Sequence, residues 1–174
     1  MIIGLSGYAR SGKDTVAGML IGLHGYDNRA FAAPLKTALE LLNPIIKDNM
    51  RLDEVLTNFG WEHSKDIFPE VRRLLQVLGK EVGRDMINEN VWINIATKDL
   101  EAGDKIVFTD VRFPNEAAAV KLLNGEVWRV DRPGVEAANS HPSETAMDDW
   151  KFDAIIQNDK DMDNLKTQIR VLLG

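Results

Sequence analysis

The chain has 174 residues, of which 44% are hydrophobic and 28% are charged, the balance of an ordinary globular protein with a single domain. Its formal net charge of −6 argues against wrapping duplex nucleic acid, because Lys and Arg must displace counterions from the phosphates there. It holds no cysteine, which excludes disulfides and cysteine-bound metal, and no apolar run approaches the roughly 18 residues that cross a bilayer.

The first elements follow one another closely. Residues 1–5 form an apolar run that predicts a strand, residues 12–23 a helix, and residues 27–31 a second strand. A further helix is expected from Pro34 until Asn43 and Pro44 end it. The N-terminus lacks the basic segment and long apolar run of a signal peptide, so we expect a cytoplasmic protein with no membrane partner.

Residues 49–68 mix Asp, Asn, Gly and Pro with scattered apolar residues, which is typical of an insertion or a mobile flap. Helices are predicted at 71–86, 91–100, 114–123 and 162–173, and strands at 105–109, 126–130 and 154–156. The stretch 134–150 is polar and irregular. Short strands that alternate with longer helices predict an α/β protein with a parallel sheet.

The strongest motif joins the first strand to the first helix. Residues 7–15 read Gly-Tyr-Ala-Arg-Ser-Gly-Lys-Asp-Thr and match the pattern G-x-x-x-x-G-K of a phosphate-binding loop, or P-loop. Glycines let successive backbone amides point into one concavity, and the helix adds its unpaired N-terminal amides. We therefore expect Gly7, Arg10, Ser11, Gly12 and Lys13 to hold ATP, with Lys13 at its β and γ phosphates.

One position of the loop departs from the pattern. The residue after the lysine is usually Ser or Thr, whose hydroxyl binds Mg²⁺, but here it is Asp14, followed by Thr15. Either Asp14 acts on the metal, directly or through water, or Thr15 supplies the hydroxyl from a shifted position. The bland alternative for the whole motif is a glycine-containing turn with an exposed lysine.

Asp110 ends the apolar strand at 105–109, the usual position of the acid that orders Mg²⁺ in P-loop proteins. The carboxyl ends of parallel strands are also where open α/β sheets bind ligands. Arg112 follows two residues later and is expected at the same edge, in contact with the acceptor. The structural alternative for Asp110 is that it caps the helix at Pro114.

Phosphoryl transfer needs cations that hold two anions together, and the planar fork of arginine binds phosphate with two hydrogen bonds. Arg72 and Arg73 are expected to bind the acceptor, although adjacent helical residues point roughly 100° apart and so cannot share one task. Arg132 lies beside the polar stretch and is expected to close onto the phosphates. Solvated surface arginines are the alternative in each case. The other candidates are Arg10, Arg84 and Arg112.

An ordered series of motifs resembles the bacteriophage-type deoxynucleoside monophosphate kinases. It consists of Ser11 to Thr15, Ala33 to Lys36, Arg72 to Gly79, Trp92, Asp110 to Glu116, Val130 to Gly134, His141 with Glu144, and Asp153 to Asn158. The Lys-Asp-Thr form of the loop is itself a feature of that family. The resemblance spans Gly4 to Asn158 and is weakest between Asn49 and Phe68.

This resemblance implies a nucleoside monophosphate kinase-like fold, in which helices sandwich a parallel five-stranded sheet. It also implies a helical acceptor-binding region at about 34–90, a lid at about 132–152, and transfer of the ATP γ-phosphoryl group to a deoxynucleoside 5′-monophosphate with Mg²⁺. Gln76 and Trp92 are then expected at the acceptor and Asn158 near the donor adenine, while His141 and Glu144 lie in the lid.

The sequence is also compatible with two other functions. A dephospho-coenzyme A kinase-like protein would share the fold, but its loop normally has Ser or Thr where this chain has Asp14. A nucleotide-sensing regulatory protein would keep the loop and tend to lose the acceptor arginines, which are present here. The sequence leaves open which bases are accepted and whether the protein is a homodimer.

Overall fold

The computed structural model describes residues 1–137 and 145–174. The chain divides into two compact units, which are described separately. The first consists of Met1–Phe31 together with Asp99–Gly174, and the second of Ala32–Lys98. The prediction of a single domain stays a prediction.

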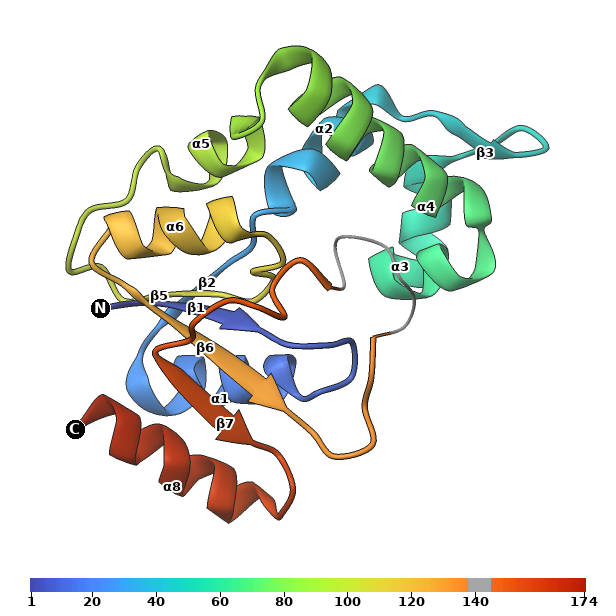
Figure 1. Ribbon diagram of the computed structural model, residues 1–174. Coiled ribbons are helices and arrows are strands. Elements are labelled where there is room, and N and C mark those ends of the chain that lie inside the picture. The colour runs from blue at the N-terminus through green and yellow to red at the C-terminus, as the bar shows by residue number, and fades with distance from the viewer. Residues whose placement is uncertain (138–144) are drawn as a thin grey trace. The chain divides into compact units, whose positions relative to one another are not determined.

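The first unit is built on a five-stranded sheet (Figure 1). Its strand order is β2-β5-β1-β6-β7, and every neighbouring pair is parallel. The strands are β1 (Ile2–Ser6), β2 (Asp27–Arg29), β5 (Ile106–Phe108), β6 (Glu126–Asp131) and β7 (Ala154–Gln157). The predicted parallel sheet is therefore confirmed, and its first strand lies in the middle.

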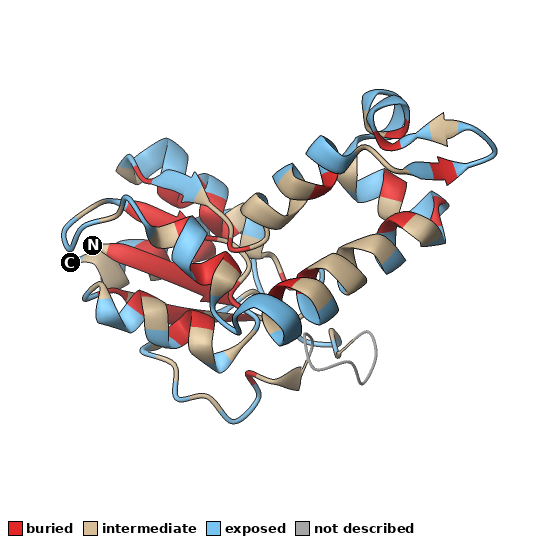
Figure 2. Ribbon diagram, turned by 90° about the horizontal axis from the view of Figure 1, so that it is seen from above, coloured by how far each residue is buried: buried red, intermediate tan, exposed pale blue. Residues whose placement is uncertain are grey.

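Helices cover both faces of this sheet. α1 (Lys13–His24) and α8 (Met162–Leu173) pack on one face and on each other, and α6 (Pro114–Leu122) lies on the opposite face (Figure 1). Because β1 is covered on both sides, all five of its residues are buried, which explains its continuous apolar run. The central strands β1 and β5 are buried throughout and stand out in Figure 2, and the core around them includes Leu5, Leu20, Trp128, Ile156 and Ile169.

The second unit is mainly helical. It contains α2 (Ala33–Leu42), the antiparallel pair β3 (Ile45–Lys47) and β4 (Met50–Arg51), α3 (Leu52–Ile67), α4 (Pro69–Gln76), the π-helix η1 (Val77–Ile87) and α5 (Val91–Thr97). Leu39, Ile46, Leu52, Val55, Phe68 and Val71 form a core within this unit.

The expectation of an irregular insertion at residues 49–68 is wrong. This segment supplies β4 and the whole of α3, whose Leu52 and Val55 are completely buried. The periodicity is hidden because Gly60 interrupts the helix with a non-helical φ of 65° and ψ of 170°. Two short helical halves on either side of a kink do not give one continuous apolar stripe.

The helix predicted at 71–86 is also only partly right, since it changes to π-helix from Val77. Within this π-helix the Gly79 carbonyl accepts a 2.8 Å hydrogen bond from Trp92 Nε1. A Cβ atom on Gly83 would lie 2.5 Å from the same indole nitrogen, so glycine is needed for this approach. No helix in the described ranges is long and apolar enough to cross a membrane.

Candidate functional site

The phosphate loop leaves the central strand at its carboxyl end and runs into α1. Three of its residues have positive φ: Gly7 (134°), Arg10 (66°) and Gly12 (107°). A Cβ atom on Gly7 would lie 2.4 Å from the Val130 carbonyl oxygen, and one on Gly12 would lie 2.4 Å from Asn158 Nδ2. Both glycines are therefore required by conformation and by space.

The Lys13 side chain folds back onto the loop and bonds to its backbone. Its Nζ donates to the carbonyl oxygens of Gly7 and Tyr8, both at 2.7 Å, and the Tyr8 carbonyl also accepts from Ser11 N at 3.2 Å. The ammonium group thus lies against the backbone of the first half of the loop. Asp14 and Thr15 occupy that first turn, Asp14 exposed and Thr15 partly buried.

The Ser11 hydroxyl is buried in this loop, and the residue is only 1% exposed. Within the described part of the chain its Oγ finds no hydrogen-bond partner. A buried hydroxyl without a partner carries an energetic cost unless a ligand or water satisfies it. The loop therefore fits an oxygen-rich anion such as a polyphosphate.

Asn158 is distant from the phosphate loop in the sequence but contacts it in the structure. Its Nδ2 donates to the Ser11 carbonyl at 2.8 Å, and its backbone N–H donates to the Asp131 carbonyl at 2.7 Å. The structure thus brings Asn158 together with residues 7–15, as expected for the donor side. Its amide contacts the loop backbone; contact with an adenine stays a prediction.

Asp110 follows β5 and accepts a 2.8 Å hydrogen bond from the Phe31 backbone N–H through Oδ1. It does not cap α6, because the N-cap of that helix is Phe113. Glu116, which is 4% exposed, accepts from the backbone N–H groups of Arg112 (2.8 Å) and Phe113 (3.1 Å). Sequence analysis missed this buried carboxylate, although a Glu two residues after a Pro at the helix start is a capping signal.

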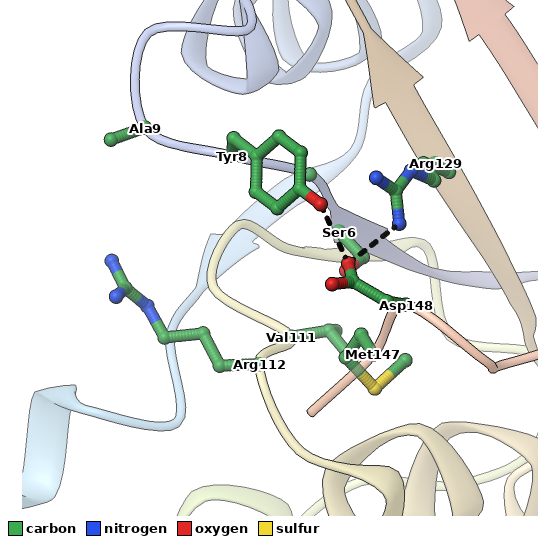
Figure 3. Close-up of a pocket in the computed structure, with 9 residues that line it drawn as sticks. Ser6, Tyr8, Ala9, Val111, Arg112, Arg129, Met147 and Asp148 are labelled. Carbon is green, nitrogen blue, oxygen red and sulfur yellow. Dashed lines mark hydrogen bonds and ion pairs between the residues drawn. The ribbon is translucent and has the colours of Figure 1, made fainter. Parts of the chain in front are cut away.

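Arg112 is exposed and lines a small hollow beside the loop, together with Ser6, Gly7, Tyr8, Ala9, Val111, Arg129, Met147 and Asp148 (Figure 3). Arg132 is exposed just beyond β6. Part of the expected lid, including His141 and Glu144, lies outside the described residues.

The same hollow contains three side chains that sequence analysis did not single out as a group. The Tyr8 hydroxyl donates to Asp148 Oδ1 at 2.8 Å, and Arg129 lies 3.5 Å from that oxygen. Arg129 also donates to Asp131 Oδ1 at 2.7 Å. Burial lowers the pKa of the Arg129 guanidinium, but its hydrogen bonds to Asp131 and Tyr8 outweigh this and raise the pKa above its usual range.

Apart from Arg112, which lies in the first unit, the expected acceptor residues belong to the second unit. Arg72 and Arg73 are exposed on α4, where Arg72 lies 3.4 Å from Asp66 and Arg73 binds Glu70 with two hydrogen bonds of 2.7 and 2.8 Å. Gln76 is exposed at the end of the same helix. Trp92 is 8% exposed and lies in the interior of this unit, with its indole N–H bound to Gly79.

Among the described residues, no group of three or more His, Cys, Asp and Glu side chains could hold a metal ion by itself. Mg²⁺ commonly takes only one or two protein carboxylates and completes its shell with phosphate oxygens and water. The hard oxygen atoms of Asp14, Thr15 and Asp110 fit such a partial site.

Comparison with solved structures supports the fold. The crystal structure of TT1252 from Thermus thermophilus aligns with a TM-score of 0.50, covering 99% of this chain and 96% of that one. Sequence identity is 20%, so this likeness concerns the fold alone.

Sequence comparisons identify relatives. A mimivirus protein named "Putative deoxynucleotide monophosphate kinase" (Acanthamoeba polyphaga mimivirus) is 30% identical over 97% of this chain and 94% of its own length. The deoxynucleoside-5′-monophosphate kinase of Escherichia phage T5 is 37% identical over 33% of the chain, and the deoxynucleotide monophosphate kinase of Enterobacteria phage T4 is 27% identical over 58%. These two matches span 24% and 44% of the phage proteins.

The family described as deoxynucleotide monophosphate kinase matches residues 54–169, which include α4, Asp110, Arg112 and Asn158. The match covers more than half of the sequence, and the mimivirus relative extends it over nearly the whole chain. The chain belongs to the deoxynucleotide monophosphate kinase family.

Proposed function

We propose that this protein transfers the γ-phosphoryl group of ATP to a deoxynucleoside 5′-monophosphate and releases ADP and the deoxynucleoside diphosphate. Family membership gives the acceptor class. The observation that carries the donor side is the strand–loop–helix unit at residues 6–15, with its two required glycines and Lys13 folded across the loop.

On the donor side, the loop amides and the Ser11 hydroxyl bind the phosphates of ATP. Lys13 exchanges the carbonyl oxygens of Gly7 and Tyr8 for phosphate oxygens and neutralises their charge. Asn158 keeps the second half of the loop in place through Ser11. The Arg10 side chain, exposed at a positive φ, contributes a further cation to the bound donor.

Mg²⁺ would be held by Asp110 and by Asp14 or Thr15, and it supplies neutralisation of the charge that develops on the transferred group. Asp110 is prepared for this by its hydrogen bond from Phe31, which fixes one carboxylate oxygen.

On the acceptor side, Arg72, Arg73 and Arg112 bind the monophosphate, and Arg132 completes the charge neutralisation from the proposed lid. An ionised oxygen of the monophosphate attacks the γ phosphorus and the bond to the ADP oxygen breaks, so no general base is required. Gln76 binds the base. Trp92 shapes this region from within, given its buried hydrogen bond to Gly79.

The remaining parts of the proposal concern the whole protein. We propose a single kinase domain that works in the cytoplasm, or in the host cytoplasm if the gene is carried by a phage. Its partners are nucleotides rather than nucleic acid, consistent with a net charge of −6. Dimerisation is a separate question for solution measurements.

A coupled assay of ADP release across the four deoxynucleoside monophosphates tests the proposal. We expect turnover with at least one of them and none with dephospho-coenzyme A. Lys13→Ala should lower kcat by about 10²- to 10³-fold, because an electrostatic contact to the reacting group is lost. Lys166→Ala removes a partly exposed lysine that pairs with Asp163 on α8, and should leave turnover unchanged.

Folded protein without turnover on any deoxynucleoside monophosphate would refute the assignment. Activity with dephospho-coenzyme A alone would indicate the other kinase class. Slow ATP hydrolysis that no acceptor stimulates would indicate a nucleotide-sensing protein.

A further inference from the structure

The first half of the phosphate loop is held by side chains outside the P-loop motif. Tyr8 is the second residue of the loop, and its hydroxyl donates to Asp148 Oδ1 at 2.8 Å. The Arg129 guanidinium lies over the Tyr8 ring, 5.0 Å from its centroid, and 3.5 Å from the same Asp148 oxygen. Figure 3 shows the Tyr8 hydroxyl and Arg129 converging on Asp148, while Arg112 points away from them.

Arg129 is well placed to organise this contact. It pairs in the sheet with Ser6, the last residue of β1, so its side chain starts next to the point where the loop begins. Its side chain is only 14% exposed and is fixed by a 2.7 Å bond to Asp131. It also lies 5.5 Å from the Phe152 ring centroid, so it approaches both the end of β6 and a residue shortly before β7.

The contact has a consequence for nucleotide binding. The carbonyl oxygen of Tyr8 is one of the two that bind Lys13. When Lys13 turns to phosphate oxygens, this half of the loop loses that internal bond. The Tyr8 side chain takes no part in this exchange, because its hydroxyl bonds to Asp148 and its ring lies beneath Arg129 rather than against Lys13.

We propose that Tyr8, Asp148 and Arg129 form a tether that keeps the first half of the phosphate loop in its binding conformation, with Arg129 as the positioning residue. This rests on the proposed function only in taking the loop to be the nucleotide site. The tether reduces the ordering that the loop must undergo on binding, and so it raises affinity for the donor nucleotide. Its three side chains are not among the proposed acceptor residues.

Calorimetric titration of the full chain with ADP and Mg²⁺ tests the tether directly. Tyr8→Phe removes the hydroxyl but keeps the ring beneath Arg129, and Asp148→Ala removes the acceptor. Each should raise the Kd for ADP about threefold, as expected for one partly exposed hydrogen bond. The double variant should be no weaker than Asp148→Ala alone, because both changes break the same bond.

Arg129→Met should raise the Kd about tenfold, since it loses the contacts to Asp148 and to the Tyr8 ring together. Arg129→Lys keeps the charge without the planar fork and should lie between Arg129→Met and the wild type. Asp163→Asn is the matched control, because it removes a carboxylate bound to Lys166 at 2.8 Å on α8, and it should not change the Kd. Thermal unfolding shows that each variant is folded.

Kinetics separate the tether from a general loss of structure. The KM for ATP should rise in the tether variants, while the KM for the deoxynucleoside monophosphate stays constant. Unchanged ADP affinity in Tyr8→Phe, or additive effects in the double variant, would overturn the tether and leave the kinase assignment intact. Tight ADP binding without turnover of any deoxynucleoside monophosphate would instead overturn the kinase assignment and leave the tether intact.

Discussion

Arg72 and Arg73 are neighbours on α4, but their side chains make different contacts. Arg73 makes a bidentate pair with Glu70 in its own helix, and this hydrogen bonding raises its pKa and lowers that of Glu70. Arg72 makes one longer contact of 3.4 Å with Asp66. Binding a phosphate therefore disturbs fewer existing bonds at Arg72 than at Arg73.

We predict that Arg72→Gln raises the KM for the deoxynucleoside monophosphate by at least tenfold, because charge-assisted hydrogen bonds are about twice as strong as neutral ones. Arg73→Gln should have the smaller effect. The KM for ATP should stay constant in both variants, as measured by the coupled ADP assay. Glu70→Gln releases Arg73 without removing an arginine and serves as the control; a larger effect of Arg73→Gln than of Arg72→Gln would contradict the assignment.

At the residue scale, the sequence predicted the donor loop well because its chemistry is local. Gly7, Gly12 and Lys13 are recognisable from spacing alone, and the structure explains the glycines by close contacts. Asn158 came only from the family resemblance. Arg129 and Asp148 were missed because their contacts join β6 to a segment with no motif, and spacing within a sequence does not reveal such pairs.

At the element scale, α1 provides an internal comparison between two kinds of glycine. Gly12 precedes the helix with φ of 107° and faces Asn158, whereas Gly22 lies within the helix, exposed, with no atom within 4 Å of an added Cβ. We predict that Gly12→Ala destabilises the protein by about 1–3 kcal/mol and weakens ADP binding. Gly22→Ala should stabilise it by about 0.5–1 kcal/mol.

Urea unfolding of both variants, followed by titration with ADP, measures these effects. The opposite signs are the decisive feature, since the same methyl group is added at each position. A neutral Gly12→Ala would mean that the loop relaxes without cost and that its geometry is less constrained than the contact with Asn158 indicates.

The hydrogen bonds of Asp153, which lies just before β7, predict that the stability of the protein depends on pH. Asp153 accepts from Lys121 Nζ of α6 and from Val127 N of β6, both at 2.7 Å. Partial burial raises the pKa of this carboxyl, but the two hydrogen bonds outweigh it and hold the pKa below 3.8. The contribution is therefore complete above the unfolded-state pKa, and it is lost as the pH falls through the lower folded-state value.

We predict that Asp153→Asn costs about 1 kcal/mol at pH 7, a value reduced by the partial exposure of the pair. The difference from the wild type should shrink in urea unfolding at pH 3. Asp149→Asn, at an exposed neighbouring position, should stay within about 0.5 kcal/mol at both pH values. If the difference in unfolding free energy between the wild type and Asp153→Asn instead grew as the pH falls, the carboxylate would not be the stabilising form.

Element prediction succeeded where the periodicity is unbroken. The last helix was placed at its observed bounds, and β1 within one residue of them. It failed where glycine changes the helix, at Gly60 within α3 and in the π-helix that contains Gly79 and Gly83. There the conformation is selected by tertiary contacts, such as the approach of Trp92, which a local pattern does not contain.

At the scale of the whole molecule, the parallel sheet follows from alternating elements and was predictable. The sequence also predicted a helical region at about 34–90 within a single domain; the second unit, Ala32–Lys98, spans that region, and the single domain stays a prediction. Each unit has its own core, around Leu5 and Trp128 in the first and around Leu52 and Val71 in the second. The donor loop and Arg112 belong to the first unit, whereas the proposed acceptor residues Arg72 and Arg73 belong to the second.

This separation predicts that the two substrates protect different parts of the chain in hydrogen–deuterium exchange. ADP with Mg²⁺ should slow exchange in residues 7–15, where amides bind phosphate, and leave α4 nearly unchanged. A deoxynucleoside monophosphate alone should slow exchange in Pro69–Gln76, because bound ligand reduces local opening of the helix that holds it. The Arg72→Gln variant should lose the second effect and keep the first. Protection by the monophosphate that is confined to the first unit, with α4 unaffected, would remove α4 from the acceptor site.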